Sequence, residues 1–489
     1  MTAKAVMVLG TTSGAGKSWL TTALCRYYSR QGLKVAPYKA QNMSNNARVV
    51  AGGEIGSAQY FQALAARATP EVRMNPLLLK PEKDTQSQIV LMGQVNTALS
   101  RMDWRSRSKH VWPVIAQALD ELMAENDVVV IEGAGSPAEI NLKASDIVNM
   151  RVALHANASC LLVTDIDRGG AFAHLYGTWA MLDAAEQQLI KGFVLNKFRG
   201  DAKLLAPGPH MLRDLTGVPT VATLPMWWQH GLPEEDGVFD DRSLSSGTVT
   251  RTIAVIAYPR ISNLDEFQPL KNVPGLRLVW VRSPAELARL STTDWVILPG
   301  SKATSSDLAW LRAQGLDQAI AGHAGQGGAV LGICGGLQML GEALIDPYGI
   351  DGNGPGLGLL PVVTVFEENK TVRQRQTCFG ALHGAWAQLS GVAVSGYEIH
   401  HGQTTLRTDM AASGSFAQQV MPDDLAWQAE TISCAGNVLG VYVHGLFENP
   451  AVLQALFGAT VPTLDTVFEG LADYVGQHFE TDFLQSLIH

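Results

Sequence analysis

The chain has 489 residues, a length that suggests two to four domains of ordinary size. Hydrophobic residues make up 46% of the chain and charged residues 17%, which is typical of a globular protein with sizeable cores. The net charge of −9 provides no electrostatic footprint for nucleic acid, and no apolar run reaches the ~20 residues of a membrane-spanning helix. The five cysteines are scattered and form no CxxC pair, so neither a disulfide framework nor a thiolate zinc site is expected. We therefore expect a cytoplasmic protein whose partners are small molecules, not nucleic acid or a membrane.

Short apolar runs alternate with helical patterns along the chain, which predicts an α/β fold of mainly parallel sheets flanked by helices. A stretch rich in Asp, Ser and Gly lacks apolar periodicity and predicts a linker at residues 236–250. The linker separates a P-loop domain at residues 1–235 from a second α/β domain at 251–489. The expected strands are Ala5–Leu9, Val35–Tyr38, Val128–Ile131, Cys160–Thr164, Gly192–Leu195, Thr252–Tyr258, Leu276–Val281, Trp295–Leu298 and Ala329–Ile333.

A glycine-rich loop, Gly10 to Ser18, joins the first expected strand to a helix-like stretch. Glycines such as Gly14 and Gly16 let backbone N–H groups turn toward phosphate oxygens, and a helix N-terminus adds partial positive charge. In this arrangement Lys17 reaches the outer phosphates and the Ser18 hydroxyl ligates Mg²⁺. The loop therefore predicts an ATP site with Mg²⁺.

Five residues, not the usual four, separate Gly10 from Gly16. This spacing resembles dethiobiotin synthetase and its P-loop relatives, which activate carboxylates by phosphoryl transfer. The resemblance implies that Lys39, after the second strand, and Asn196, at the end of a later strand, contact the nucleotide.

Two acidic residues are candidate partners of Ser18 in holding Mg²⁺. Glu132 ends an expected strand in a Glu-Gly-Ala-Gly turn, and hard cations bind carboxylate oxygens beside phosphates. A solvated glutamate at a strand end is the alternative. Glu54 is a third candidate by weaker analogy, and an ordinary loop role for it stays equally open.

Amide and carboxylate side chains follow several expected strands. Gln41, Asn42 and Asp146 belong to such clusters and would suit a substrate rich in hydrogen-bonding groups. Ordinary loops also use these residue types, so both interpretations remain open.

The second domain contains Gly332-Ile333-Cys334-Gly335-Gly336 between an apolar strand and a helical stretch, Leu337–Leu344. This strand, sharp turn and helix form a nucleophile elbow with cysteine in the reactive position. A helix N-terminus stabilises a thiolate, and nearby N–H groups hold an oxyanion, as the Leu298–Ser301 turn would also do. A buried structural cysteine is the alternative. His444, at a later strand end, is the expected base.

Residues 251–450 resemble the class I glutamine amidotransferases, which have a flavodoxin-like fold. Members of that class usually carry a carboxylate two residues after the histidine, where this chain has Leu446. Glu448 is the nearest acidic substitute. The prediction is therefore a Cys334–His444 dyad without an assigned third member.

Longer motifs resemble the cobyric acid synthase family over nearly the whole chain. The resemblance implies ATP- and glutamine-dependent amidation of the b, d, e and g carboxylates of adenosylcobyrinic acid a,c-diamide through an acyl phosphate. Two alternatives remain: the synthase that amidates the a and c carboxylates, and a P-loop switch whose amidotransferase half is a scaffold. The motifs are Lys-Ala-Gln-Asn-Met-Ser (39–44), Met-Asn-Pro-Leu-Leu-Leu-Lys-Pro (74–81), Glu-Gly-Ala-Gly-Ser-Pro-Ala-Glu-Ile-Asn-Leu (132–142), Asp-Ile-Asp-Arg-Gly-Gly (165–170) and Gly-Tyr-Glu-Ile-His (396–400).

Overall fold

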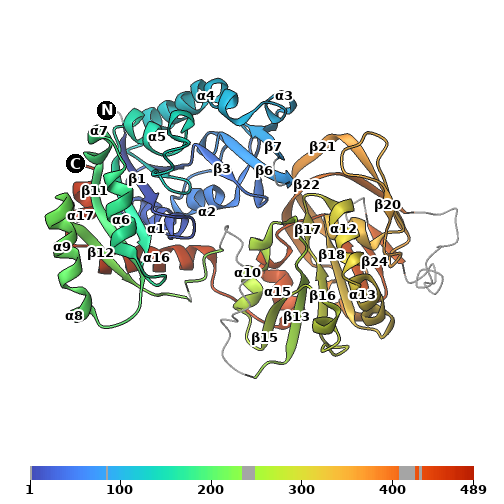
Figure 1. The fold of residues 1–489 in the computed structure, drawn as a ribbon. Helices are drawn as coiled ribbons and strands as arrows, with labels where there is room; N and C mark the ends of the chain where they lie inside the picture. The colour runs from blue at the N-terminus through green and yellow to red at the C-terminus, as the bar shows by residue number, and fades with distance from the viewer. Residues whose placement is uncertain (1–2, 84–85, 229, 234–247, 407–424, 429–431) are drawn as a thin grey trace.

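The computed structural model describes residues 3–83, 86–228, 230–233, 248–406, 425–428 and 432–489. It confirms the predicted α/β class, with two mainly parallel sheets flanked by helices (Figure 1). Every strand expected from the sequence forms within a few residues of its predicted bounds. Most of the predicted linker, residues 236–247, lies outside the described residues. Within the described residues, no helix combines the length and apolar character needed to cross a membrane.

The first sheet is parallel throughout, in the order β12-β11-β10-β1-β9-β2. Its central strands are runs of Val, Ile and Leu because helices bury both faces of the sheet. The carboxyl ends of β1, β9, β10 and β11 meet at one edge, where open α/β sheets bind ligands. The strands are β1 (Lys4–Gly10), β2 (Val35–Tyr38), β9 (Val128–Glu132), β10 (Ser159–Asp165), β11 (Ile190–Phe198) and β12 (Thr220–Pro225).

Shorter strands and the helices α1 to α9 accompany this sheet in the first part of the chain. A four-stranded sheet of order β3-β6-β7-β8 and a hairpin, β4–β5, lie on the side that faces the second half (Figure 1). The strands are β3 (Gln41–Met43), β4 (Ala47–Val50), β5 (Gly53–Gly56), β6 (Leu77–Lys83), β7 (Gln86–Leu91) and β8 (Gln94–Val95). The helices are α1 (Lys17–Ser29), α2 (Ser57–Ala65), α3 (Thr97–Ser100), α4 (Trp104–Glu125), α5 (Met150–His155), α6 (Ala171–Ala180), α7 (Ala184–Gln187), α8 (Ala202–Leu205) and α9 (Pro207–Thr216).

The second sheet has the order β15-β13-β16-β18-β25-β24-β23, parallel up to β25 and antiparallel at the β24–β23 edge. Its strands are β13 (Arg251–Ile256), β15 (Leu276–Val281), β16 (Trp295–Leu298), β18 (Ala329–Ile333), β23 (Leu425–Gln428), β24 (Ile432–Ala435) and β25 (Val438–Val441). The other strands are β14 (Ile261–Ser262), β17 (Gly300–Ser301), β19 (Ala343–Ile345), β20 (Gly354–Pro355), β21 (Val362–Cys378) and β22 (Ala393–Leu406). The helices are α10 (Gln268–Lys271), α11 (Pro284–Leu287), α12 (Thr304–Ala313), α13 (Leu316–Gly325), α14 (Gly335–Leu340) and α15 (Pro450–Phe457).

The helix predicted at Leu337–Leu344 is wrong at its end. Helix α14 stops at Leu340, and Ala343–Ile345 is strand β19. Gly341 adopts an extended conformation there and lies so close to Val362 that a Cβ would be 2.7 Å from its carbonyl oxygen. The glycine thus ends the helix and lets the chain pack against β21.

The last two helices, α16 (Leu464–His478) and α17 (Phe483–Ser486), pack on the first half of the chain (Figure 1). Tyr28 of α1 donates a hydrogen bond to the carbonyl of Leu484 at 2.7 Å. Arg26 pairs with Asp465 and Glu469 of α16 at 2.6 and 3.0 Å. The predicted division places these helices with the second domain, whereas their side chains share a core with α1 and β1.

Candidate active site

The loop after β1 wraps around the Lys17 ammonium group. Lys17 Nζ donates to the carbonyl oxygens of Thr12 at 3.0 Å and Gly135 at 3.2 Å. Gly14 and Gly16 have φ of 71° and 102°, in the left-handed region where a side chain is strained. The predicted P-loop residues therefore lie together at the start of α1.

Asn196 closes this loop from the end of β11. Its Nδ2 donates to the carbonyl of Ala15 at 2.9 Å, and a Cβ on Gly16 would lie 2.1 Å from the same nitrogen. The structure thus brings Asn196 to the P-loop, as the prediction of a nucleotide contact requires.

Glu132, at the end of β9, is the hub of polar contacts beside the loop. The Ser18 hydroxyl donates to Oε1 at 2.7 Å, and Lys39 Nζ lies 2.8 Å from the same oxygen. Two amides of α2, Gln62 and Gln59, donate to Oε2 at 2.5 and 3.4 Å. Burial alone would raise the pKa of Glu132, but Lys39 and these hydrogen bonds lower it, so the carboxylate is ionised.

The Ser18 and Glu132 side chains fit the predicted Mg²⁺ site. Their hydroxyl and carboxylate oxygens are adjacent at the mouth of the P-loop. Mg²⁺ is typically held by one or two such protein oxygens, with phosphates and water completing its octahedron.

Glu54 lies elsewhere, and the prediction that it is a third metal ligand is not supported. Its carboxylate pairs with Lys80 and with Lys370, the latter at 2.5 Å from Oε1. Burial alone would raise the pKa of Glu54, but Lys370 and Lys80 lower it to about 2. A carboxylate neutralised by two ammonium groups has little negative charge to offer a cation.

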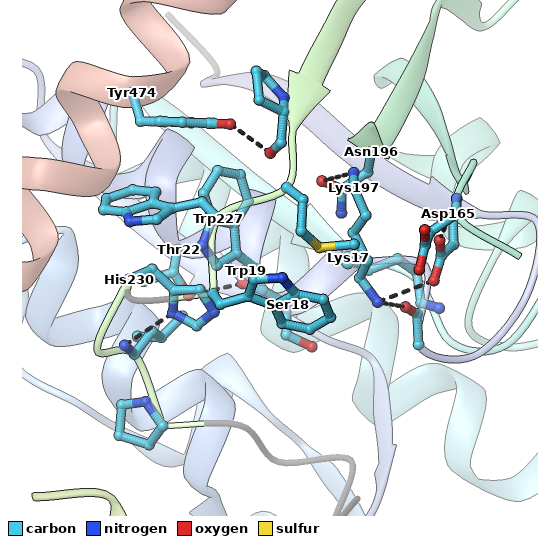
Figure 2. Close-up of a pocket in the computed structure, with 18 of the residues that line it drawn as sticks. Lys17, Ser18, Trp19, Thr22, Asp165, Asn196, Lys197, Trp227, His230 and Tyr474 are labelled. Atoms are coloured by element: carbon cyan, nitrogen blue, oxygen red, sulfur yellow. Dashed lines mark hydrogen bonds and ion pairs between the residues drawn. The ribbon is translucent and has the colours of Figure 1, made fainter. Parts of the chain in front are cut away.

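A cavity of about 330 Å³ opens beside Lys17 and Ser18 and is lined by aromatic rings (Figure 2). Trp227 stacks on Tyr474 with ring centroids 4.8 Å apart, and Trp19 meets Tyr474 edge-on at 5.6 Å. Flat apolar ring faces beside a phosphate loop suit a nucleobase. Tyr474 belongs to α16, so no local signal near the P-loop identifies it.

The two predicted substrate residues of β3 are buried near this site. Asn42 Nδ2 donates to Gln59 at 3.3 Å, one side chain away from Glu132. Gln41 is 7% exposed, and its Oε1 accepts no hydrogen bond from the part of the chain that the structure describes. An unsatisfied buried oxygen favours a ligand contact there.

Asp146 has a structural role instead. Its Oδ1 accepts hydrogen bonds from the backbone N–H groups of Val148 and Asn149 at 2.9 and 3.0 Å. Asn149 in turn bonds both backbone groups of Ala134, in the turn after Glu132. Asp146 therefore shapes the turn after Glu132 through Asn149, which gives no support to the predicted substrate contact.

Cys334 lies between β18 and α14 in the strained geometry of a nucleophile elbow. Its φ of 52° and ψ of −105° are unfavourable for a residue with a Cβ. A Cβ on Gly336 would lie 1.9 Å from the carbonyl oxygen of Leu298, so only glycine allows α14 to start this close to β16. At Gly335 a Cβ would be 2.8 Å from the Ser301 nitrogen, which places the predicted oxyanion loop beside the nucleophile.

The structure brings His444 to Cys334 and supplies a third residue. The Cys334 side chain interacts electrostatically with the imidazole, and His444 Nδ1 lies 3.1 Å from Glu266 Oε1. Burial alone would lower the pKa of His444, but Glu266 and Cys334 raise it to about 10. The arrangement thus favours the imidazolium form of His444, and a cation beside a cysteine stabilises the charge that its sulfur carries as a nucleophile.

Glu448, the nearest acidic substitute in the sequence, has another role. It forms a two-pronged ion pair with Arg48, with oxygens 2.6 and 2.9 Å from the guanidinium nitrogens. Glu266 orients the histidine in its place from a 3₁₀ turn, η3 (Leu264–Phe267), far upstream in the chain.

A second cavity, of about 1090 Å³, joins the two halves of the protein. Cys334 and His444 line it from one side, and Glu54 and Lys80 from the other. The nucleophile therefore opens toward the first domain.

Comparison with known proteins finds one family model in each half of the chain. Residues 6–228 match the CobQ/CobB/MinD/ParA nucleotide binding domain family, and residues 252–452 match the CobB/CobQ-like glutamine amidotransferase domain family. The chain is 82% identical over 488 residues to a cobyric acid synthase of Polaromonas naphthalenivorans (strain CJ2) and 74% identical over 488 residues to one of Variovorax paradoxus (strain S110). Both matches cover 100% of this chain and 100% of the relative. The chain therefore belongs to the cobyric acid synthase family of ATP-dependent amide ligases.

Proposed function

We propose that this enzyme converts the b, d, e and g carboxylates of adenosylcobyrinic acid a,c-diamide to amides, with ATP and glutamine as the other substrates. One observation carries the proposal: Cys334 and His444 face a cavity shared with the P-loop domain, and the buried Glu266 holds His444 from behind at 3.1 Å. The choice of carboxylates follows from the family.

Glutamine cleavage starts at Cys334. The thiolate attacks the side-chain carbonyl carbon of glutamine, and N–H groups near Gly335 and Ser301 hold the oxyanion. His444 donates its proton to the departing ammonia, which leaves a glutamyl thioester. His444 then takes a proton from water, and the hydroxide hydrolyses the thioester to glutamate and the free thiolate.

Carboxylate activation takes place at the P-loop. A substrate carboxylate attacks the γ-phosphorus of ATP, which breaks the bond to the β,γ-bridging oxygen and releases ADP. Lys17 stabilises the charge on the transferring phosphoryl group. Ser18 and Glu132 would hold Mg²⁺, which would supply further charge neutralisation at the phosphates. Gln41 and Asn42 contact the corrinoid rim. Ammonia attacks the resulting acyl phosphate, which yields the amide and releases phosphate.

Ammonia must reach the acyl phosphate before it is protonated in bulk water. The large cavity between the domains, with Cys334 and His444 on one wall, is the sheltered space for this transfer.

Turnover of Cys334→Ala tests the proposal. The variant should lose glutamine-dependent amidation and keep ammonia-dependent amidation, with the amides counted by mass spectrometry of the corrinoid. Amidation of the a and c carboxylates instead would identify the related synthase. Absence of amide formation from either nitrogen source by the wild-type protein would indicate a P-loop switch.

A further inference from the structure

The β4–β5 hairpin of the P-loop domain is anchored in the amidotransferase domain by a buried arginine. Arg48 is 2% exposed and pairs with both Asp265 and Glu448 of the second domain. Two reciprocal hydrogen bonds flank it. The backbone N–H of Ala47 donates to Asn263 Oδ1 at 3.1 Å, and the backbone N–H of Leu264 donates to Asn46 Oδ1 at 3.1 Å. The first domain therefore holds the start of the η3 turn.

Asp265 and Glu266 are neighbours on that turn and face different partners. Asp265 binds Arg48, whereas Glu266 accepts hydrogen bonds from the His444 ring at 3.1 Å and the Gly445 N–H at 3.0 Å. Both carboxylates are at most 2% exposed. Because the turn is short, whatever fixes Asp265 also fixes the carboxylate that orients the catalytic histidine.

Arg48 reaches the histidine by a second route. Its guanidinium lies 5.0 Å from the ring centre of Tyr397, and that ring stacks on His444 at 5.4 Å. The Tyr397 and His444 backbones also exchange hydrogen bonds of 3.3 and 2.9 Å.

Helix α2 connects the same arginine to the nucleotide site. The guanidinium lies 4.9 Å from the ring centre of Phe61, and Ser57 Oγ is 3.5 Å from Asp265 Oδ1. On the same helix, Gln59 and Gln62 donate to Glu132 of the P-loop site.

We infer that Arg48 is a positioning residue for glutamine cleavage, which holds η3 so that Glu266 orients His444 and which ties that geometry to α2. Nucleotide binding at Ser18 changes the set of hydrogen bonds on Glu132, and α2 passes this change to Arg48 and Asp265. Glutamine cleavage is thereby favoured when the P-loop domain is loaded. The inference rests on the Cys334–His444 chemistry proposed above.

The test compares glutamine-dependent with ammonia-dependent amidation in the full-length enzyme. Arg48→Met should lower the ratio of the two rates by about 10-fold to 100-fold, the range expected when a catalytic group is misplaced by a change in its support. Arg48→Lys keeps the charge and should lose less. Glutaminase activity of the wild type should rise when ATP and Mg²⁺ are added, and Arg48→Met should respond less.

Gln374→Ala is the matched control. It removes a cross-domain hydrogen bond to the carbonyl of Val49 on the same hairpin, without touching η3, and should leave the ratio at the wild-type value. Asp265→Asn keeps the shape of the side chain but removes its charge. It tests the Arg48–Asp265 ion pair if Arg48→Met fails to fold. Its effect should not multiply with that of Arg48→Lys, because the two changes act on one ion pair.

An unchanged ratio in Arg48→Met, or an equal loss of both activities, would overturn the inference. A wild-type glutaminase indifferent to ATP would overturn its link to the nucleotide site. These outcomes differ from a failure of the proposed function, which Cys334→Ala tests. If Cys334→Ala kept glutamine-dependent turnover, the cysteine mechanism itself would be wrong.

Discussion

Glu266 Oε1 lies 3.1 Å from His444 Nδ1, although 178 positions separate the two residues in the chain. The second oxygen of Glu266 accepts the Gly445 N–H at 3.0 Å, so the carboxylate holds both the ring and the backbone beside it. The buried carboxylate holds the imidazole in one orientation and stabilises its protonated form, as the acidic member of a catalytic triad does.

Glu266→Gln should lower glutaminase kcat by about 10⁴-fold, the loss that follows when the acid of a catalytic triad is replaced by its amide. Removing the negative charge also lowers the pKa of His444 from about 10, so the alkaline limb of the glutaminase pH profile should move to lower pH. Steady-state glutaminase rates across pH measure both effects. Ammonia-dependent amidation serves as the control, and an unshifted alkaline limb would contradict a charge role for Glu266.

The same ion pair predicts a pH dependence of stability. The pKa of His444 is raised from 6.5 to about 10 in the folded protein. Its stabilising contribution is therefore complete below pH 6.5 and declines as pH rises through about 10. The difference in free energy of unfolding between wild type and Glu266→Gln should shrink over this window in urea titrations. A difference that grows with pH would contradict the assignment.

Contiguous motifs were predictable from the sequence because strand, turn and helix define their geometry locally. The P-loop at Lys17 and the elbow at Cys334 are of this kind, and both form as expected. Glu266 and Tyr474 were not predictable, because both are far in the sequence from the groups they meet. Folding brings Glu266 to His444 and Tyr474 to the P-loop. The partners of Glu54 are also set by tertiary packing: Lys370 comes from the other domain.

Tyr474→Ala should raise the KM for ATP by about 5-fold to 100-fold, the loss expected from one base-stacking ring. The ring lies in the cavity beside Lys17 and stacks on Trp227. Tyr474→Phe keeps the ring but loses the hydroxyl bond to the Pro225 carbonyl, 2.6 Å long, and is the matched control. ATP titrations at saturating ammonia and corrinoid measure the effect. Equal KM values for Tyr474→Ala and the wild type would mean that the adenine base of ATP does not bind against this ring.

Glu132→Gln should raise the Mg²⁺ concentration needed for half-maximal ammonia-dependent amidation. The amide has one oxygen and no charge, so it binds a hard cation more weakly than the carboxylate beside the Ser18 hydroxyl. The measurement is a Mg²⁺ titration after removal of metal with a chelator.

Glu54→Gln provides the comparison for this titration. Glu54 is paired with Lys80 and Lys370, away from the P-loop oxygens, so its substitution should leave the Mg²⁺ requirement at the wild-type value. Suppose Glu54→Gln raised the Mg²⁺ concentration for half-maximal activity as much as Glu132→Gln does. Glu54 would then have to break its ion pairs with Lys80 and Lys370 and bind the metal when the nucleotide binds. Such a result would restore the third ligand that the sequence motif predicts.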